Sequence, residues 1–465
     1  MRLFNLKNLS LFSLAVAAIS STASAQDSHY WSNQYGTRSA LLGGAVVGSV
    51  RDTSAGFYNP GALGFIDNEA LSVSANALKY ESVSLDNGAG TGDDLDSDNI
   101  QALPLMISGI WKDKDLPDHT FGYTFLTKDS SKLNFSARRD SQGEIFPGGG
   151  PEDYIGQFTY DQQINEYWGG LSYAYKATPN VSVGLTNFLA YRSENRNSSA
   201  LVRTVNPQFP DAFVVADNTS LVDYDSLRLL WKLGAAAEFD ALKLGISVTT
   251  PSVNIYGDGT SARDITGAGT GNTNFIADDR QENLDAETRT PFSVAGGATY
   301  DLEKTKLHAT VEWFGAKGAY NVMVPESRNI VKPSNAEAVD ARDALLVTSG
   351  ADAVVNWALG VEHQICDKVT GFASFRSDYE AQREGTNLGI SNWDIYHATV
   401  GATYRRENSE LGVGLVYSFG DTDDYSQAVN FDDASLDNGL FGRSQQTSVD
   451  YEAVSLIVGY TYFLN

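Results

Sequence analysis

The 465-residue chain has only one cysteine, Cys366, so it cannot contain an internal disulfide framework. After residue 25 it has no run of about 18 apolar residues, so we expect no membrane-spanning helix. Basic residues are also scarce, because 33 Lys and Arg stand against 58 Asp and Glu and give a formal charge of −25. This acidity excludes nucleic acid as a partner, since binding it needs a basic surface.

The N-terminal stretch MRLFNLKNLSLFSLAVAAISSTASAQ has the pattern of a secretory signal peptide. Arg2 and Lys7 form a basic start, residues 9–19 are apolar, and a small-residue cleavage site ends at Ala25. The apolar stretch is too short to span a membrane, which disfavours the alternative of an anchor. We therefore predict a signal peptide over 1–25, and export without disulfides fits a bacterial envelope protein.

After residue 68 the chain alternates between apolar and small or polar residues, which is the pattern of β-strands. In LRLLWKLGAAAEF, Leu227, Leu229 and Trp231 share one face, while Arg228 and Lys232 share the other. The same alternation runs through YWGGLSYAYKA, VVNWALGVEHQI and LGVGLVYSF. A barrel with lipid outside and a packed or wet lumen inside requires such strands, and the many Gly, Tyr and Phe residues also fit a membrane barrel.

Short turns give the expected strand count. Six of them follow Trp111, Ala177, Phe239, Leu302, Ile365 and Arg405, and each joins two strands. With a first strand from Glu69 to Tyr80 and a last strand from about Ser448 to Phe463, they predict an all-β fold, a transmembrane antiparallel β-barrel of about 14 strands. The polar segments between the hairpins are predicted to be long extracellular loops: 81–100, 129–164, 193–222, 252–288, 316–352, 379–393 and 420–445.

Aromatic residues support this orientation, with the short turns on the periplasmic side. The residues beside a turn or the C-terminus include Trp111, Tyr175, Phe239, Tyr300, Tyr404 and Tyr462. A membrane barrel places aromatic girdles at such positions, at the interface with water. The alternative all-β folds, a soluble sandwich or propeller, give no reason for this arrangement.

The predicted loops contain no complete catalytic or metal-binding motif. TGAGTGN, from Thr266, has closely spaced glycines but no following helix, so it does not predict a phosphate site. The acidic stretches 93–99 and 420–426 resemble calcium loops but lack the full ligand pattern, so solvated loops are the simpler interpretation. The five histidines form no local hydrolase or metal signature, which argues against a barrel phospholipase. We expect no enzymatic activity, no metal and no cofactor.

Residues 26–68 precede the first strand and include Leu41, Leu42, Val46, Val47 and Phe57. A barrel of about 14 strands is too wide for its own side chains to close it, so we predict that this segment folds into the lumen as a plug. The alternative is a flexible periplasmic leader, but disordered tails are usually poor in such apolar residues.

The stretch GGAVVGSVRDTSAGFYNPGALGF resembles the N-terminal hatch of the FadL family, outer-membrane transporters of long-chain fatty acids that include TodX-type channels for aromatic hydrocarbons. That family has a hatch with an Asn-Pro-Ala motif inside a fourteen-stranded barrel, and Asn59-Pro60-Gly61 occupies the motif here. The resemblance implies a hatch over 26–68 and a barrel over 69–465. This chain differs in having glycine at the third motif position and in ending at Asn465, where an aromatic residue is common.

The resemblance also implies a function, the passive uptake of hydrophobic molecules such as long-chain fatty acids or aromatic hydrocarbons. It assigns ligand contacts to Phe57, Asn59, Pro60 and Gly61 in the hatch. The ligand of this family leaves through a gap in the barrel wall at a kink in the third strand. Here the third strand offers Gly122, and the neighbouring strand offers Pro104, which lacks a ladder hydrogen bond. Both positions stay open as the lateral opening.

An acidic barrel needs a local cation to hold an anionic ligand. The strand alternation points Arg228, Lys232 and Arg376 into the lumen, and we predict that they contact the ligand. The alternative is that they balance lumen carboxylates, for which Glu238, Glu312 and Glu362 are the candidates.

Two other functions stay open, a general diffusion porin and a partner-binding barrel of a secretion system. A porin lumen should be lined by charges, whereas the inward faces here are rich in Gly, Ser, Ala and Thr. We expect a monomer in the outer membrane of a Gram-negative cell. Its expected partners are outer-membrane lipid, lipopolysaccharide and a hydrophobic small-molecule ligand whose identity the sequence leaves open.

Overall fold

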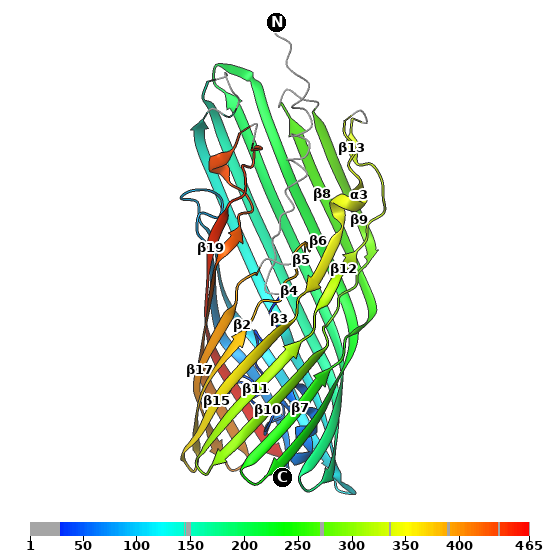
Figure 1. Cartoon of the computed structure of the whole chain (residues 1–465), viewed down its shortest axis with the longest axis vertical. Coiled ribbons are helices and arrows are strands. Elements are labelled where there is room, and N and C mark those ends of the chain that lie inside the picture. The colour runs from blue at the N-terminus through cyan, green and yellow to red at the C-terminus, as the bar shows by residue number, and fades with distance from the viewer. Residues whose placement is uncertain are drawn as a thin grey trace.

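The computed structural model describes residues 28–143, 145, 150–269, 274–333, 336–387, 391–435 and 438–464, without the side chains of 209–212. The predicted signal peptide, residues 1–25, lies outside this described part. The described chain is a tall, tilted-strand barrel with the C-terminus at its short-turn rim (Figure 1).

The barrel is one closed antiparallel sheet, and 14 strands of the described chain form its ring. β1 and β19 pair from Glu69↔Leu464 to Leu85↔Val449, which closes the ring. The predicted all-β barrel is therefore confirmed. Its strands are β1 (Glu69–Leu85), β2 (Leu95–Asp113), β3 (Leu116–Gly143), β4 (Glu152–Thr178), β5 (Val181–Asn206), β6 (Phe209–Phe239), β7 (Leu242–Thr249), β10 (Ser293–Leu302), β11 (Thr305–Phe314), β15 (Val354–Cys366), β16 (Val369–Asp378), β17 (Ile395–Arg406), β18 (Ser409–Ser426) and β19, the last of which spans Gln446–Leu464.

The short turns lie where the sequence predicts them. For example, β6 ends at Phe239 and β7 begins at Leu242, while β10 ends at Leu302 and β11 begins at Thr305. The predicted girdle residues are each 40–50% exposed: Trp111, Tyr175, Phe239, Tyr300, Tyr404 and Tyr462. Large apolar side chains above them also face outward. An outward apolar band with an aromatic rim is the surface that a barrel presents to lipid.

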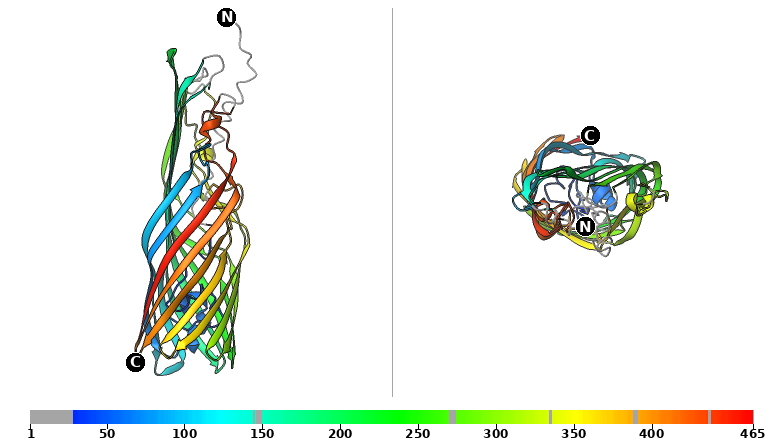
Figure 2. Two further views of the ribbon diagram at one scale, coloured as in Figure 1. Left: turned by 90° about the vertical axis from the view of Figure 1, so that its left-hand side faces the viewer. Right: turned by 90° about the horizontal axis from the view of Figure 1, so that it is seen from above.

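The prediction that 129–164, 193–222 and 252–288 are loops is wrong. β3, β4, β5 and β6 continue through the first two segments, and β8 (Val253–Ala268) and β9 (Phe275–Asp285) occupy much of the third. Polar residues are common on both faces of these extensions, so the alternation in the sequence is weak. Their inner face nevertheless buries a hydrophobic cluster that includes Tyr154, Phe158 and Tyr160. The extended strands form a wall that rises above one side of the barrel (Figure 2).

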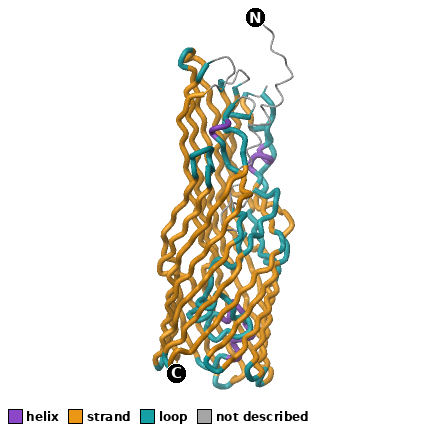
Figure 3. Tube along the Cα trace, turned by 60° about the vertical axis from the view of Figure 1, so that its left-hand side comes forward, coloured by secondary structure: helices purple, strands orange, loops and turns teal. Residues whose placement is uncertain are grey.

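The other extracellular segments pack against the inner face of this wall. They contain β12 (Lys317–Met323), β13 (Val331–Lys332), α3 (Ala341–Leu345), β14 (Val347–Ala351) and η3 (Phe431–Asp433). Tyr320 and Val322 of β12, for instance, pack with Val222 and Tyr224 of β6. Helices are few and short (Figure 3), and no helix among the described residues is long and apolar enough to cross a membrane.

Residues 28–68 lie inside the barrel and are mostly buried (Figures 1 and 2). The segment includes α2 (Ala55–Tyr58) and η2 (Pro60–Phe65). It begins near the segment between β16 and β17, where the Ser28 hydroxyl donates to the carbonyl of Ser391 at 2.8 Å. It ends at the short-turn rim, immediately before β1. The segment therefore runs through the lumen along the barrel axis.

Candidate functional site

Asn59 joins three parts of the lumen by side-chain hydrogen bonds. Its Oδ1 accepts from the backbone N–H of Gly61 at 3.0 Å and so caps η2. Its Nδ2 donates to the carbonyl of Val47 at 2.9 Å and to the carbonyl of Ala235 on β6 at 3.0 Å. Asn59 is fully buried, so its own amide group is satisfied by these bonds. Asn59 therefore links two parts of the N-terminal segment to each other and links the segment to the barrel wall.

The wall beside Asn59 consists of bare backbone, because glycines face the segment there. A Cβ atom on Gly184 would lie 2.4 Å from the carbonyl oxygen of Pro60, and one on Gly61 would lie 2.8 Å from the Cα of Ala235. Pro60 and Gly61 are therefore packed directly against the backbone of the wall. They do not line the lumen cavity described next, whereas Phe57 does.

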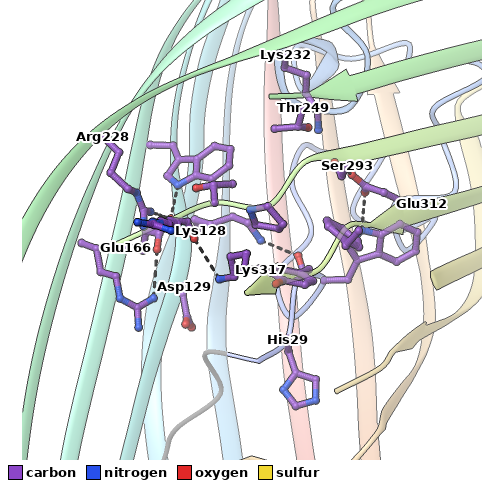
Figure 4. A pocket seen from close by; sticks show the side chains of 18 of the residues that line it. His29, Lys128, Asp129, Glu166, Arg228, Lys232, Thr249, Ser293, Glu312 and Lys317 are labelled. Carbon is purple, nitrogen blue, oxygen red and sulfur yellow. Dashed lines mark hydrogen bonds and ion pairs between the residues drawn. The ribbon is translucent and has the colours of Figure 1, made fainter. Parts of the chain in front are cut away.

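A cavity of about 90 Å³ lies in the lumen between the N-terminal segment and the extracellular segments (Figure 4). Its aromatic lining comes from two places. Phe57 of α2 stands edge-on to Trp168 of β4, with ring centroids 6.2 Å apart. Tyr30 stacks on Phe314 of β11, with centroids 4.4 Å apart. The cavity is thus bounded by ring faces and ring edges, which suit an apolar or aromatic molecule.

The same cavity is rich in positive charge. Six of its lining residues are cations and three are carboxylates. The cations are Lys128, Arg192, Arg228, Lys232, Arg289 and Lys317, and the carboxylates are Asp129, Glu166 and Glu312. In a chain with a formal charge of −25, this local excess of cations is the reverse of the overall balance.

Arg228 points into the lumen, as the strand alternation predicts. Its guanidinium group already forms an ion pair with a carboxylate. Its Nη2 lies 2.5 Å from Oε1 of Glu166 on β4, and its Nη1 donates to the hydroxyl of Thr288 at 2.7 Å. Oε2 of Glu166 also lies 3.3 Å from Nη1 of Arg192, and its Oε1 accepts a hydrogen bond from the indole N–H of Trp168 at 2.6 Å. In this arrangement Arg228 is paired with the lumen carboxylate of Glu166.

Arg376 also points inward but lies outside this cavity. Its Nε donates to the carbonyl of Trp31 at 3.3 Å, and its Nη2 donates to the carbonyl of Ser32 at 3.2 Å. Asp378, two residues later on β16, accepts from the backbone N–H groups of Tyr30 and Trp31. Arg376 and Asp378 together hold the start of the N-terminal segment against the wall.

Lys232 differs from its neighbours. Only 5% of the residue is exposed, and its Nζ lies 4.6 Å from the centroid of the Phe57 ring. Among the described residues, none forms a hydrogen bond or an ion pair with its ammonium group. Figure 4 shows Lys232 beside Thr249, apart from the paired group around Glu166. Of the three predicted cations, Lys232 is thus the one whose charge faces the cavity without a partner.

The carboxylates predicted to need balancing have partners on the N-terminal segment. Glu362 pairs with Arg38 at 2.5 Å and with Lys306 at 3.0 Å, and Glu238 pairs with Arg51. The oxygens of Glu312 accept from the Trp31 indole at 2.9 Å and from the Ser293 hydroxyl at 2.6 Å. These contacts tie the segment to β6, β11 and β15.

The wall is discontinuous between β2 and β3, next to Pro104. Ladder pairing of these strands runs from the turn only as far as Met106↔Leu126. Beyond that point the hydroxyl of Thr127 donates to the carbonyl of Pro104 at 2.7 Å. Gly122, in contrast, pairs in register with Ile110 and with Ser172 on its two sides, so the ladder does not break there.

An apolar groove of about 740 Å³ opens on the wall at this discontinuity. Pro104, Met106 and Phe125 line it, and so does Trp168, which also lines the lumen cavity. Trp168 therefore contacts both the groove and the cavity.

A β-bulge and the N-terminal segment meet at the same place. The register of β3 against β4 shifts between Thr127 and Asp129, so Lys128 is the extra residue. The Tyr35 hydroxyl donates to the carbonyl of Thr127 at 3.0 Å, and the Lys128 Nζ donates to the carbonyl of Tyr30 at 2.6 Å. Burial raises the pKa of the Tyr35 phenol, so its hydroxyl stays protonated and available as a donor.

Sequence reasoning missed the residues that complete the site. Glu166 and Arg192 lie close to the segments predicted to be loops, where their strand alternation was not used. Lys128 changes face because of the bulge, which no pattern in a single sequence marks. Trp168 could have been found, since it follows Tyr167 in a predicted strand and alternation points it inward.

No group of three or more His, Cys, Asp or Glu side chains placed to hold a metal ion occurs in the described part of the chain. The calcium-like stretch 93–99 enters β2, and 420–426 forms the end of β18. Each stretch is thus largely extended strand rather than the compact, turned loop that a calcium site of this kind requires.

The fold has clear counterparts among solved structures, although no known protein family and no curated protein matches the chain by sequence. A FadL homologue of Pseudomonas aeruginosa is 14% identical, with a TM-score of 0.60 over 93% of this chain and 99% of that one. The toluene transporter TodX of P. putida is 12% identical, with a TM-score of 0.59 over 93% and 99%. The toluene transporter TbuX of Ralstonia pickettii is 13% identical, with a TM-score of 0.53 over the same shares. The chain therefore has the fold of the FadL and TodX outer-membrane barrels.

Proposed function

We propose that the protein is an outer-membrane channel for the passive uptake of hydrophobic small molecules, and that residues 28–68 act as its hatch. The observation that carries the proposal is the lumen cavity, which is walled by aromatic rings and closed on one side by the N-terminal segment. The solved structures with this fold are described as a FadL homologue and as toluene or monoaromatic hydrocarbon channels, which supports the same class of cargo.

The route has three stages. A ligand enters from the extracellular side, where the raised wall and its packed segments surround the lumen. It rests in the cavity against Phe57 and Trp168. It then leaves through the discontinuity between β2 and β3 near Pro104, since Trp168 lines both the cavity and the outer groove. An exit into the membrane suits an apolar molecule, because it never has to cross the periplasmic end of the hatch.

The alternative of a general diffusion porin is disfavoured by the ties between the segment and the wall. Asn59 and Arg51 bond to β6 and Arg38 bonds to β15, so the lumen is filled by a fixed element. The alternative of a partner-binding barrel has no observation in its favour. We propose a monomer that contacts outer-membrane lipid and lipopolysaccharide through its apolar band, and that has no enzymatic activity.

The proposal is tested in proteoliposomes that contain the purified mature protein. Uptake of toluene and of palmitate is measured, together with steady conductance in planar bilayers. The expected result is uptake of at least one compound above that of protein-free liposomes, with little conductance. A large steady conductance without selectivity would show a porin instead, and uptake no faster than in protein-free liposomes would refute transport.

A variant with Trp168→Arg tests the route. It places a charge between the cavity and the outer groove, so it should slow uptake while leaving the barrel folded. The matched control is Trp357→Arg, because Trp357 lies on the outward face of β15, away from the groove. Equal uptake by the two variants would exclude passage beside Trp168.

A further inference from the structure

We infer that the lumen cavity selects small aromatic carboxylates, and that Lys232 binds their carboxylate group. This inference rests on the proposed function and names its substrate class. It differs from the two classes that the fold alone suggests, because a long-chain fatty acid lacks the ring and a hydrocarbon lacks the charge.

The first argument is the state of Lys232. Only 5% of the residue is exposed, and no described residue forms an ion pair or a hydrogen bond with its ammonium group. A buried cation is costly unless it has a partner. The ring face of Phe57 attracts the charge but accepts no strong hydrogen bond, so the ammonium group keeps donors for a further oxygen atom.

The other cations of the cavity are already engaged, which makes Lys232 distinctive. Arg228 and Arg192 share Glu166, and Arg289 pairs with Glu287 at 2.6 Å. Lys128 and Lys317 each donate to a backbone carbonyl. Glu312 also lines the cavity, but both its oxygens already accept hydrogen bonds. An incoming carboxylate would therefore find its partner at Lys232.

The second argument is the aromatic lining of the cavity that the Lys232 ammonium group faces. Phe57, which lies under the ammonium group, also meets Trp168 edge-on, and the stacked pair Tyr30 and Phe314 lines the same cavity. Aromatic rings prefer edge-to-face or offset contacts with other rings. A ligand with its carboxylate on Lys232 would place its body among these four rings, so a ring is the body that fits best.

The third argument is size. The cavity of about 90 Å³ is on the scale of the apolar cavity of roughly 150 Å³ that admits one benzene molecule. Sites for larger ligands occupy roughly 300–1,000 Å³. A volume this small favours a ligand of one ring with a small substituent over an extended acyl chain.

The test measures binding of three probes to the mature protein in detergent at pH 7.5 by isothermal titration calorimetry. Benzoate carries the ring and the charge, toluene carries the ring alone, and palmitate carries the charge on a long chain. Wild type should bind benzoate more tightly than either of the others. Lys232→Met should weaken benzoate binding by roughly 10- to 100-fold, since a charged hydrogen bond is lost, and should leave toluene binding within about twofold.

Lys176→Met is the matched control. Lys176 also lies over a phenylalanine ring, 5.4 Å from the centroid of Phe65, but it does not line the cavity. Its replacement should leave benzoate binding unchanged. Retention of the barrel's heat-modifiable migration in gel electrophoresis checks that both variants fold.

Each outcome bears on the inference. Equal benzoate affinity in wild type and Lys232→Met would overturn the role of Lys232, and tighter binding of palmitate than of benzoate would overturn the ring and size selection. Uptake assays separate this from the proposed function. If proteoliposomes take up toluene or palmitate but the protein does not bind benzoate, only the inference fails. If they take up none of the three probes, the proposed function fails.

Discussion

Replacing Asn59 with alanine tests how the N-terminal segment is held. The change removes three buried hydrogen bonds, two that tie the segment to itself and one that ties it to Ala235 on β6. At about 1 kcal/mol for each bond, the local free energy of displacing the segment should fall by about 3 kcal/mol. That difference corresponds to roughly a 150-fold rise in the displaced population, because about 1.4 kcal/mol equals a factor of ten.

Hydrogen exchange followed by mass spectrometry measures this population in the mature protein. Peptides that cover residues 43–65 should exchange up to roughly 150-fold faster in Asn59→Ala, while peptides from the β18–β19 hairpin should not change. Asn33→Ala is the control, because Asn33 makes one long bond of 3.4 Å and its loss should have at most about a fivefold effect. If 43–65 in Asn59→Ala exchanges within about fivefold of wild type, Asn59 does not hold the segment.

Three further predictions follow from the lumen and its rim. Deletion of residues 26–68 should leave a folded barrel with a much higher conductance in planar bilayers, and an unchanged conductance would contradict the hatch. Arg228→Met should lower the free energy of unfolding by about 3 kcal/mol, measured in urea, because Glu166 loses one partner of a buried pair; a loss below about 1 kcal/mol would contradict that role. Burial raises the pKa of Glu380, after β16, to about 7. Because this folded-state pKa lies above the unfolded one, the residue's contribution to stability falls as pH rises from about 4.5 to 7. Glu380→Gln should therefore slow exchange in 379–387 at pH 8 and not at pH 4, and equal effects at both would refute the shift.

Much of the barrel could be predicted because the lipid-facing strands carry a strong signal. One face must be apolar wherever it meets lipid, so alternation and short turns located Phe239, Leu302 and their equivalents to within a residue or so. The same rule correctly pointed Arg228 and Lys232 inward. Above the membrane this constraint ends, since water wets the outer face and polar residues such as Asn195 and Asn197 serve equally well in a strand or a loop. The extensions of β3 to β6 were missed for that reason.

The site was only partly predictable because its contacts join distant segments. The partner of Arg228 lies 62 positions earlier in the chain, on a strand two positions away in the sheet. The bulge at Lys128 changes which residues face the lumen, and its cause lies in the pairing of β3 with β4. Alternation gives the direction of a side chain, but it does not give its neighbours. The distinction between paired Arg228 and unpaired Lys232 therefore required the structure.

The unequal strand lengths give the barrel a slanted opening. β6 has 31 residues and β10 has 10, and at about 3.3 Å per residue and a tilt of about 40° the difference is roughly 50 Å of height. The extended strands rise on the high side (Figure 2), while β10 and β11 on the low side are only 10 residues long and end much closer to the membrane. A molecule that spreads along the membrane surface would meet the low side directly, whereas one arriving from the medium would first meet the inner face of the wall. The difference in strand length therefore influences from which direction a ligand reaches the lumen.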